Sequence, residues 1–345
     1  MARKKSSNGV TIIDVAQEAG VSYSTVSRVV NNKSYVKPDT RAKVLGAMTR
    51  LGYQANLQAR SLAGGRSNVI GLLVVDLTTQ YVGEIIRGID EILTANQYEL
   101  MLYTTHRRKT KESAYVNMMA RGLADGLLIV LPRDPEAYLT SLRQRDFPYV
   151  LIDQFGIDES DLTVTAANRE GGYEATRHLI ELGHRQIGII TGWMDMVASR
   201  HRLDGYRAAL ADYHIDYRES LVFEGDFTQR CGFHGTNHLL DLAEPPTAIF
   251  ASSDLIAMGV MDAARSRNTK IPEDLSLVGF DDIPMSAVLI PQLTTVRQPL
   301  TKMGRCATQI LLDLIQKPEE EQTSVILSTE LIIRESTAPP RLDLR

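Results

Sequence analysis

Polar side chains follow several apolar runs of this 345-residue chain, near the points where the runs end. They are Asp76, Asp153, Ser253 with Asp254, Asp281 and Gln298. Open α/β sheets bind their ligands beyond the carboxyl ends of their strands, where such residues would gather. Carboxylates accept hydrogen bonds from hydroxyl groups, so the set predicts a site for a small polar ligand. For Asp254 a second interpretation stays open, in which it only caps the helix that follows.

The elements that must position these residues are apolar runs alternating with stretches of helical periodicity. The expected strands are Val69–Val75, Leu100–Thr104, Gly126–Leu131, Tyr149–Asp153, Ile187–Thr191, Ala248–Ser252 and Leu275–Phe280. The clearest helical stretches are Gly83–Ala95, Glu170–Leu182, Arg202–Asp212 and Leu255–Arg267. This alternation predicts an α/β fold of parallel, doubly wound sheets. The series is too long for one sheet, so we expect two similar lobes.

The charge of the chain is divided unevenly. The first 66 residues hold 11 Lys or Arg and only 3 Asp or Glu, so this part of the chain is basic. The whole chain holds 38 Lys or Arg and 42 Asp or Glu, so the remainder is acidic. A basic head on an acidic body is typical of a nucleic-acid-binding module joined to a domain that avoids phosphate. A solvated surface would explain the charges equally well, so the motif within the head has to decide.

The head contains the start and stop signals of three short helices. Thr11–Asp14 reads as a capping box that opens the first helix, and Gly20 ends it. Ser22 is expected to cap a second helix over Tyr23–Val30, and a third should run over Pro38–Leu51 and stop at Gly52. Two helices joined by a short turn with glycine form the helix-turn-helix arrangement.

In such a unit the second helix enters the major groove of DNA. Tyr23, Ser24 and Arg28 are the candidates that face the bases, and the guanidinium of Arg28 suits the O6 and N7 acceptors of guanine. A further group is better placed to contact phosphate, which fixes position without specifying sequence. This group consists of Ser22, Thr25, Ser27 and Asn31.

The segment Val15–Asn32, VAQEAGVSYSTVSRVVNN, resembles the head of the lac repressor/galactose repressor family, and the resemblance continues along the whole chain. It implies a sequence-specific transcriptional regulator, a repressor, that binds palindromic operator DNA under the control of a small-molecule effector. Lys37 departs from the family pattern, which usually has serine as the cap of the third helix.

The resemblance also implies a hinge helix over residues 56–66, between a DNA-binding domain of residues 1–55 and the body. Leu62 matches the leucine that wedges between base pairs in the minor groove, with Ala59 beside it, and Tyr53 and Asn56 complete the DNA-contacting set. A flexible linker with an incidental leucine is the alternative. Ala55 stands where the family usually has proline.

For the body, residues 67–338, the resemblance implies two lobes like those of periplasmic sugar-binding proteins. The N-lobe would hold residues 67–165 and 299–327, and the C-lobe residues 166–297 and 328–338. Arg202, Asp153, Ser253 and Asp281 match effector-binding positions, and Phe227 matches an aromatic on which sugars stack. With Tyr81, this set favours a sugar or oligosaccharide effector. A purine or another non-sugar effector, or a solute receptor, are the alternatives.

The sequence contains few features that would support another class of function. There is no phosphate-binding loop or nucleophile elbow, so we expect no enzyme and no cofactor. Cys231, His234 and His238 have a spacing that zinc could use, but lack a fourth ligand, so we expect no metal. Two cysteines and no apolar segment behind the N-terminal charges favour the cytoplasm. The proline-containing tail has no heptads, so we expect a homodimer formed by the body.

Overall fold

The computed structural model describes residues 10–30, 35–53 and 66–341. Its head contains α1 (Ile12–Ala19), α2 (Tyr23–Val30) and α3 (Pro38–Leu51), which confirms the three expected helices. The capping box of α1 is present, because Thr11 and Asp14 exchange hydrogen bonds. The three helices enclose a small apolar core of Val15, Ala16, Val26, Val29, Val44 and Ala47.

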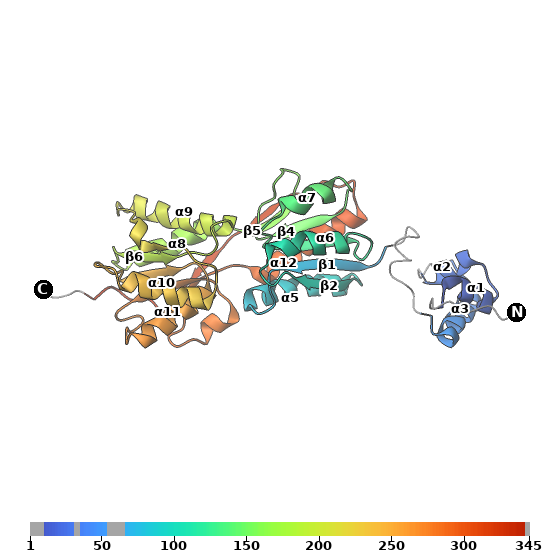
Figure 1. Ribbon diagram of the computed structural model, residues 1–345, viewed down its shortest axis with the longest axis horizontal. Coiled ribbons are helices and arrows are strands. Elements are labelled where there is room, and N and C mark those ends of the chain that lie inside the picture. The colour runs from blue at the N-terminus through green and yellow to red at the C-terminus, as the bar shows by residue number, and fades with distance from the viewer. Residues whose placement is uncertain (1–9, 31–34, 54–65, 342–345) are drawn as a thin grey trace.

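The body contains two six-stranded sheets, each with helices on both faces (Figure 1). The first has the order β11-β5-β4-β3-β1-β2 and the second the order β12-β10-β9-β8-β6-β7. The strands of the first sheet are β1 (Val69–Val74), β2 (Glu99–Thr104), β3 (Gly126–Val130), β4 (Tyr149–Ile152), β5 (Thr163–Ala166) and β11 (Val325–Leu327). Those of the second are β6 (Ile187–Ile190), β7 (Val222–Phe223), β8 (Ala248–Ala251), β9 (Ser276–Asp281), β10 (Thr294–Arg297) and β12 (Glu330–Ile332).

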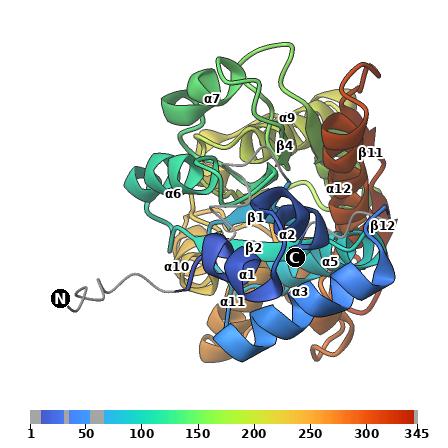
Figure 2. The same ribbon diagram turned by 90° about the vertical axis from the view of Figure 1, so that its right-hand side faces the viewer.

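Eight α-helices of the described body cover the sheets. They are α5 (Gln80–Ala95), α6 (Glu112–Met119), α7 (Glu136–Arg143), α8 (Asn168–Glu181), α9 (Val197–Asp212), α10 (Gln229–Leu240), α11 (Asp254–Ser266) and α12 (Leu300–Gln316). Three single 3-10 turns accompany them, η1 (Lys109–Lys111), η2 (Glu219–Leu221) and η3 (Pro284–Ala287). Figure 2 shows α6 and α7 on one side of the first sheet and α5 and α12 on the other. In the second sheet α8 and α9 cover one face and α10 and α11 the other.

The chain passes between the two sheets three times, from β5 to α8, from β10 to α12 and from β11 to β12. The seven expected strands are all present, but β5, β7, β10, β11 and β12 were not among them. The predicted parallel, doubly wound sheets are confirmed, because all strand pairs of the described residues are parallel except β12 with β10, which is antiparallel.

Close helix crossings fix the shape of the second lobe. A Cβ atom on Gly205 of α9 would lie 2.1 Å from the carbonyl oxygen of Arg169 in α8, and one on Gly172 would lie 2.4 Å from that of Arg202. The two backbones therefore touch where both helices carry glycine. This contact holds the start of α8, with Asn168, next to Arg202.

Two of the predicted helices start several residues too late, since α5 begins at Gln80 and not at Gly83, and the error in α9 is larger. Helix α9 begins at Val197, so Arg202 lies in its second turn and does not start the helix as expected. The extra turn carries Ala198 and Ser199, both buried, and projects Arg202 into the space between the sheets. Among the described residues, none of the helices is long and apolar enough to cross a membrane.

Candidate functional site

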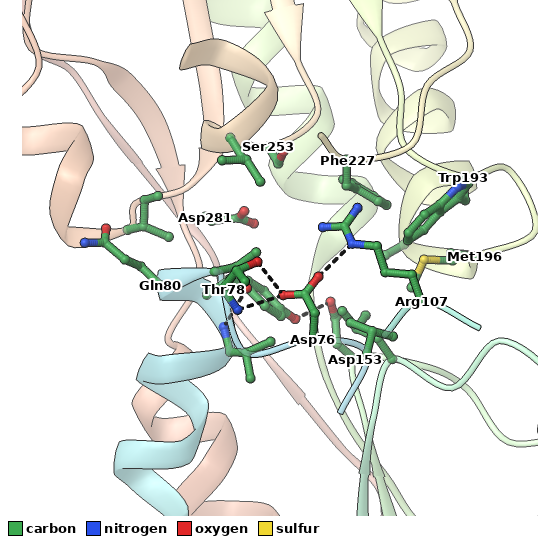
Figure 3. A pocket seen from close by; sticks show the side chains of 18 of the residues that line it. Asp76, Thr78, Gln80, Arg107, Asp153, Trp193, Met196, Phe227, Ser253 and Asp281 are labelled. Carbon is green, nitrogen blue, oxygen red and sulfur yellow. Dashed lines mark hydrogen bonds and ion pairs between the residues drawn. The ribbon is translucent and has the colours of Figure 1, made fainter. Parts of the chain in front are cut away.

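A cavity of about 310 Å³ lies between the two lobes, beyond the carboxyl ends of their strands (Figure 3). Its polar lining includes Asp76, Thr78, Gln80, Tyr81, Arg107, Asp153, Arg202, Ser253 and Asp281. Its apolar lining includes Trp193, Met196, Phe227, Leu255, Met258 and Ile283. The switch points of open α/β sheets are where ligands bind, so this cavity is the candidate effector site.

Arg202 is held rigidly at the inner end of the cavity. Its Nε donates to Oδ1 of Asn168 at 2.8 Å, and its Nη1 donates to the carbonyl oxygen of Ser252 at 2.6 Å. The guanidinium carbon lies 3.8 Å from the centroid of the Phe280 ring and 5.8 Å from that of Phe227. A buried cation needs such partners, and here they also fix the direction of its remaining donor.

Two buried carboxyl groups flank Arg202. Oδ1 of Asp281 lies 3.7 Å from its Nη1 and accepts a hydrogen bond from Nε2 of Gln298 at 2.7 Å. Asp153 accepts hydrogen bonds from Tyr81 at 2.6 Å and from Asn168 at 3.3 Å. Burial raises the pKa of Asp153 and raises that of Asp281 well above its usual range, although Arg202 opposes both shifts.

The backbone is strained at the same place. Asp281 has a φ of 119° and Asp153 a φ of 56°, and Phe227 has a φ of 60°. Side chains other than glycine rarely adopt positive φ, and such residues concentrate at binding sites. All three line the cavity.

At the other end of the cavity Asp76 pairs with Arg107, whose Nε donates to Oδ2 of the carboxylate at 2.7 Å. The backbone N–H and hydroxyl of Thr78 both donate to Oδ1 of Asp76 at 3.0 Å. Burial alone would raise the pKa of Asp76, but these hydrogen bonds and the charge of Arg107 lower it. The carboxylate is therefore charged and fixed in place.

Two residues of the expected site stand behind the cavity wall and not in its lining. Asp254 is fully buried and accepts hydrogen bonds from the N–H of Ile283, the hydroxyl of Ser286 and that of Thr295. Ser253, not Asp254, caps α11, which corrects the alternative interpretation. Gln298 lies behind Asp281 and orients it. Both side chains turn inward because strand ends offer them buried partners there.

The lobes also contact each other directly at the mouth of the cavity. Asp195, in the loop after β6, pairs with Lys109 at 2.5 Å and with Arg133 at 2.8 Å, both from the other lobe. The N–H of Met285 donates to Oε1 of Gln80 at 3.0 Å, again between lobes. These contacts join the two lobes in this structure.

Sequence reasoning missed Arg107, Trp193, Met196 and Met258. They lie in loops or on helices well separated in the chain, and only the fold brings them together. One signal was available for Trp193, the only tryptophan of the chain, because it follows the strand β6 at a short distance. Arg107 has no such signal, since it belongs to a run of basic residues that reads as a solvated surface.

The head presents a polar face on α2. Tyr23, Ser24 and Arg28 are exposed, and the Arg28 guanidinium lies 5.6 Å from the centroid of the Tyr35 ring. Ser22 is exposed and accepts a hydrogen bond from the N–H of Thr25 as the cap of the helix. Thr25 and Ser27 are half-buried and Tyr53 lies beyond α3. The remaining expected contacts, Asn31, Asn56, Ala59 and Leu62, lie outside the described residues.

Comparison with known proteins places the chain in one class of protein, in which a helix-turn-helix unit is joined to a ligand-binding domain. A family model for bacterial regulatory proteins of the lacI family matches residues 11–56, and one for a periplasmic binding protein-like domain matches residues 176–337. The chain is 34% identical to catabolite control protein A of Priestia megaterium, over 95% of this chain and 99% of that protein. It is 37% identical to the HTH-type transcriptional repressor PurR of Edwardsiella ictaluri, over 97% and 99%.

Solved structures give the same result. A complex of the transcriptional regulator CelR with cellobiose matches with a TM-score of 0.73 and 33% identity, over 95% of this chain and 99% of that chain. The lac repressor dimer bound to operator and the anti-inducer ONPF matches with a TM-score of 0.80 and 30% identity, over 96% and 100%. The chain belongs to the lacI family of bacterial regulatory proteins, and it is a DNA-binding regulator of transcription.

Proposed function

We propose that this chain is a cytoplasmic transcriptional repressor whose binding to a palindromic operator is controlled by a saccharide in the cleft between its lobes. The observation that carries the proposal is the cavity itself, in which charged and aromatic side chains share one small space. Both lobes contribute residues to the lining of the cavity, so a ligand there changes the equilibrium between arrangements of the lobes. This change can couple ligand binding to DNA binding by the head.

The chemistry of the lining favours a hydroxyl-rich ligand. Asp76 and Asp153 offer acceptors, Arg107 and Arg202 offer donors, and Phe227 offers an aromatic face. A sugar ring has alternating hydroxyl donors and acceptors around its rim and apolar C–H faces, so both kinds of surface are used. The CelR complex, a similar structure, holds cellobiose. Tyr81, Ser253 and Asp281 complete the proposed effector site.

In this proposal Tyr23, Ser24 and Arg28 of the head contact the bases of DNA. The phosphate backbone of the DNA is contacted by Ser22, Thr25, Ser27, Asn31 and Tyr53. One head offers a small surface, whereas two heads on a palindrome roughly double the phosphate contacts. A homodimer joined through the body therefore fits the task, with Asn56, Ala59 and Leu62 of the hinge at the centre of the site. The lac repressor in the similar structure is a dimer on its operator.

The experiment is thermal denaturation of the full-length protein with a panel of mono- and disaccharides and with purine bases and nucleosides. A ligand that binds only the folded state raises the melting temperature by mass action. We expect at least one saccharide to do so and to change operator affinity at a fixed salt concentration. Stabilisation by a purine alone would replace the saccharide proposal by the alternative effector class. Sedimentation that shows a monomer at micromolar concentration would remove the homodimer.

A further inference from the structure

The outer end of the cavity has its own group of charged and polar side chains. Asp76 and Arg107 form an ion pair there, with the carboxylate fixed by Thr78. The guanidinium carbon of Arg107 lies 5.4 Å from the centroid of the Trp193 ring, and that of Arg133 lies 4.0 Å from it. Arg107 is thus held in one orientation by a carboxylate on one side and an aromatic ring on the other.

Arg107 keeps a donor that this environment does not use. Its Nη1 is buried and has no hydrogen-bond partner among the described residues, although its Nε is paired. In Figure 3 the guanidinium of Arg107 points into the cavity, with Trp193 and Met196 on the opposite side from Asp281 and Ser253. A buried donor without a partner is costly, and its pairing with a ligand oxygen would remove that cost.

The two ends of the cavity repeat one chemical arrangement. At the inner end Arg202 stands beside Asp281, and at the outer end Arg107 stands beside Asp76. In such a pair the guanidinium of the arginine can donate to one hydroxyl oxygen and the aspartate can accept from a neighbouring hydroxyl, so each pair suits adjacent hydroxyls of one ring. The lining also contains an aromatic pair, in which Trp193 and Phe227 meet edge to face with centroids 6.2 Å apart.

We propose that Asp76, Arg107 and Trp193 form a second sugar subsite, so that the effector is a disaccharide and not a monosaccharide. The inference rests on the proposed saccharide effector and adds to it the number of rings. Arg107 and Asp76 would bind adjacent hydroxyls of the outer ring, and Trp193 would hold Arg107 in place and close the outer wall. The inner ring would use Arg202, Asp281 and Phe227.

The test uses the full-length protein and its only tryptophan. Because Trp193 lines the cavity, its fluorescence should report filling of the outer subsite, and calorimetry gives the affinity independently. The probes are cellobiose, maltose, lactose, sucrose and trehalose, each compared with its component monosaccharides, and glucose 6-phosphate as an anionic probe. We expect one disaccharide to bind about tenfold or more tightly than either component, with a change in fluorescence.

Variants locate the second ring. Arg107→Gln should lower affinity for the disaccharide about tenfold or more while leaving affinity for its inner-ring monosaccharide unchanged. Arg108→Gln is the matched control, because this neighbouring arginine is exposed and does not line the cavity, and it should bind like the parent. Trp193→Phe should retain the preference for the disaccharide, and Trp193→Ala should lose it. Melting temperatures without ligand show whether each variant is folded.

The possible failures are distinguishable. A monosaccharide that binds as tightly as every disaccharide overturns the second subsite and leaves the saccharide effector standing. Equal losses of monosaccharide and disaccharide affinity in Arg107→Gln also overturn it, because Arg107 would then act on the inner ring. Tighter binding of glucose 6-phosphate than of any disaccharide assigns Arg107 to an anion and overturns the second ring. Binding of no saccharide at all removes both proposals.

Discussion

The guanidinium of Arg202 lies over the ring of Phe280, 3.8 Å from its centroid, while Asn168 and the carbonyl of Ser252 hold its nitrogen atoms. Asn168 begins α8, directly after the chain has crossed from the first sheet, and it also donates to Asp153 of that sheet. One chain of hydrogen bonds therefore runs from Asp153 in one lobe through Asn168 to Arg202 in the other. A ligand that contacts Arg202 would act on both lobes at once.

Arg202→Ala is expected to abolish the response to the effector and to leave operator affinity without effector unchanged. The truncation leaves a polar group of the ligand unpaired, which weakens its binding by about 1.5–3 kcal/mol. Arg207→Ala is the control, since Arg207 lies on the same helix but is exposed and pairs with Asp204. Ligand and operator affinities are measured at one salt concentration, with circular dichroism to show that the variant is folded. Release from the operator that matches the parent protein would exclude Arg202 from the effector site.

Gly205→Ala should destabilise the protein, because its Cβ would lie 2.1 Å from a backbone oxygen of α8 that cannot move alone. Overpacking of this kind costs about 1–3 kcal/mol in unfolding free energy. Gly83→Ala, also within a helix, is the matched control, because nothing lies within 4 Å of its added Cβ. It should stabilise by about 0.5–1 kcal/mol, because alanine has the higher helix propensity. Denaturant melts compare the two, and equal shifts would contradict the close crossing of α8 and α9.

The predictability of the fold differs between its elements for physical reasons. The strands that contain Leu72 and Ile129 are continuous apolar runs, because both faces of a parallel sheet are buried, and the sequence shows them plainly. Strands β5 and β10 are rich in threonine, with Thr163 and Thr294 both buried, and so they resemble loops. In β10 the hydroxyl of Thr294 accepts from the N–H of Arg334 and that of Thr295 donates to Asp254, and no local pattern reveals such distant partners.

The candidate site shows the same division. Asp153 and Asp281 could be found because they follow apolar strands, and the fold class fixes where strand ends meet. Asp254 and Gln298 satisfy the same rule, yet buried donors and acceptors draw them behind the wall. Arg107 lies in a basic loop and enters the cavity only because Asp76 and Trp193 hold it there. Spacing along the chain cannot give such long-range partners.

Stability should depend on pH through Asp254. Burial raises the pKa of this carboxyl from its ordinary value of 3.8 to about 7, although three hydrogen-bond donors oppose the shift. Between these values the folded protein binds more protons than the unfolded chain, so the unfolding free energy falls as pH rises and levels off above about 7. The buried groups Asp153 and Asp281, whose pKa values are also raised, contribute in the same direction.

Asp254→Asn should therefore flatten the fall in unfolding free energy between about pH 4 and pH 7, by up to a few kcal/mol. The amide can still accept from Ile283 and donate to the hydroxyl of Thr295, so the fold is expected to persist. Urea melts of parent and variant across this range give the two slopes. Asp262→Asn, on the same helix but with a side chain that is 41% exposed, should leave the slope as it is. Identical slopes in the parent and Asp254→Asn would show that Asp254 stays ionised when folded.

The two cations of the head should differ in what they contribute to operator binding. Arg28 lies on the exposed face of α2, with its guanidinium stacked near Tyr35, whereas Lys37 precedes α3 and makes no side-chain cap. If Arg28 reads guanine, Arg28→Ala should weaken binding by about 1–3 kcal/mol and relax the preference at one base pair of each half-site. Lys37→Ala should weaken all sequences alike and reduce the slope of log affinity against log salt by about one for each phosphate that Lys37 neutralises.

The measurement is binding of both variants to an operator selected with the parent protein, to single-base changes of it, and across a range of salt concentrations. Selection is needed first, because the preferred bases must come from the parent and not from either variant. Arg28→Lys separates charge from geometry, since lysine keeps the charge but lacks the planar fork that contacts two acceptors of guanine. It should retain the salt slope and still lose the base preference. If Arg28→Ala keeps the base preference of the parent and only lowers the salt slope, Arg28 contacts phosphate, and the bases are read by Tyr23 and Ser24.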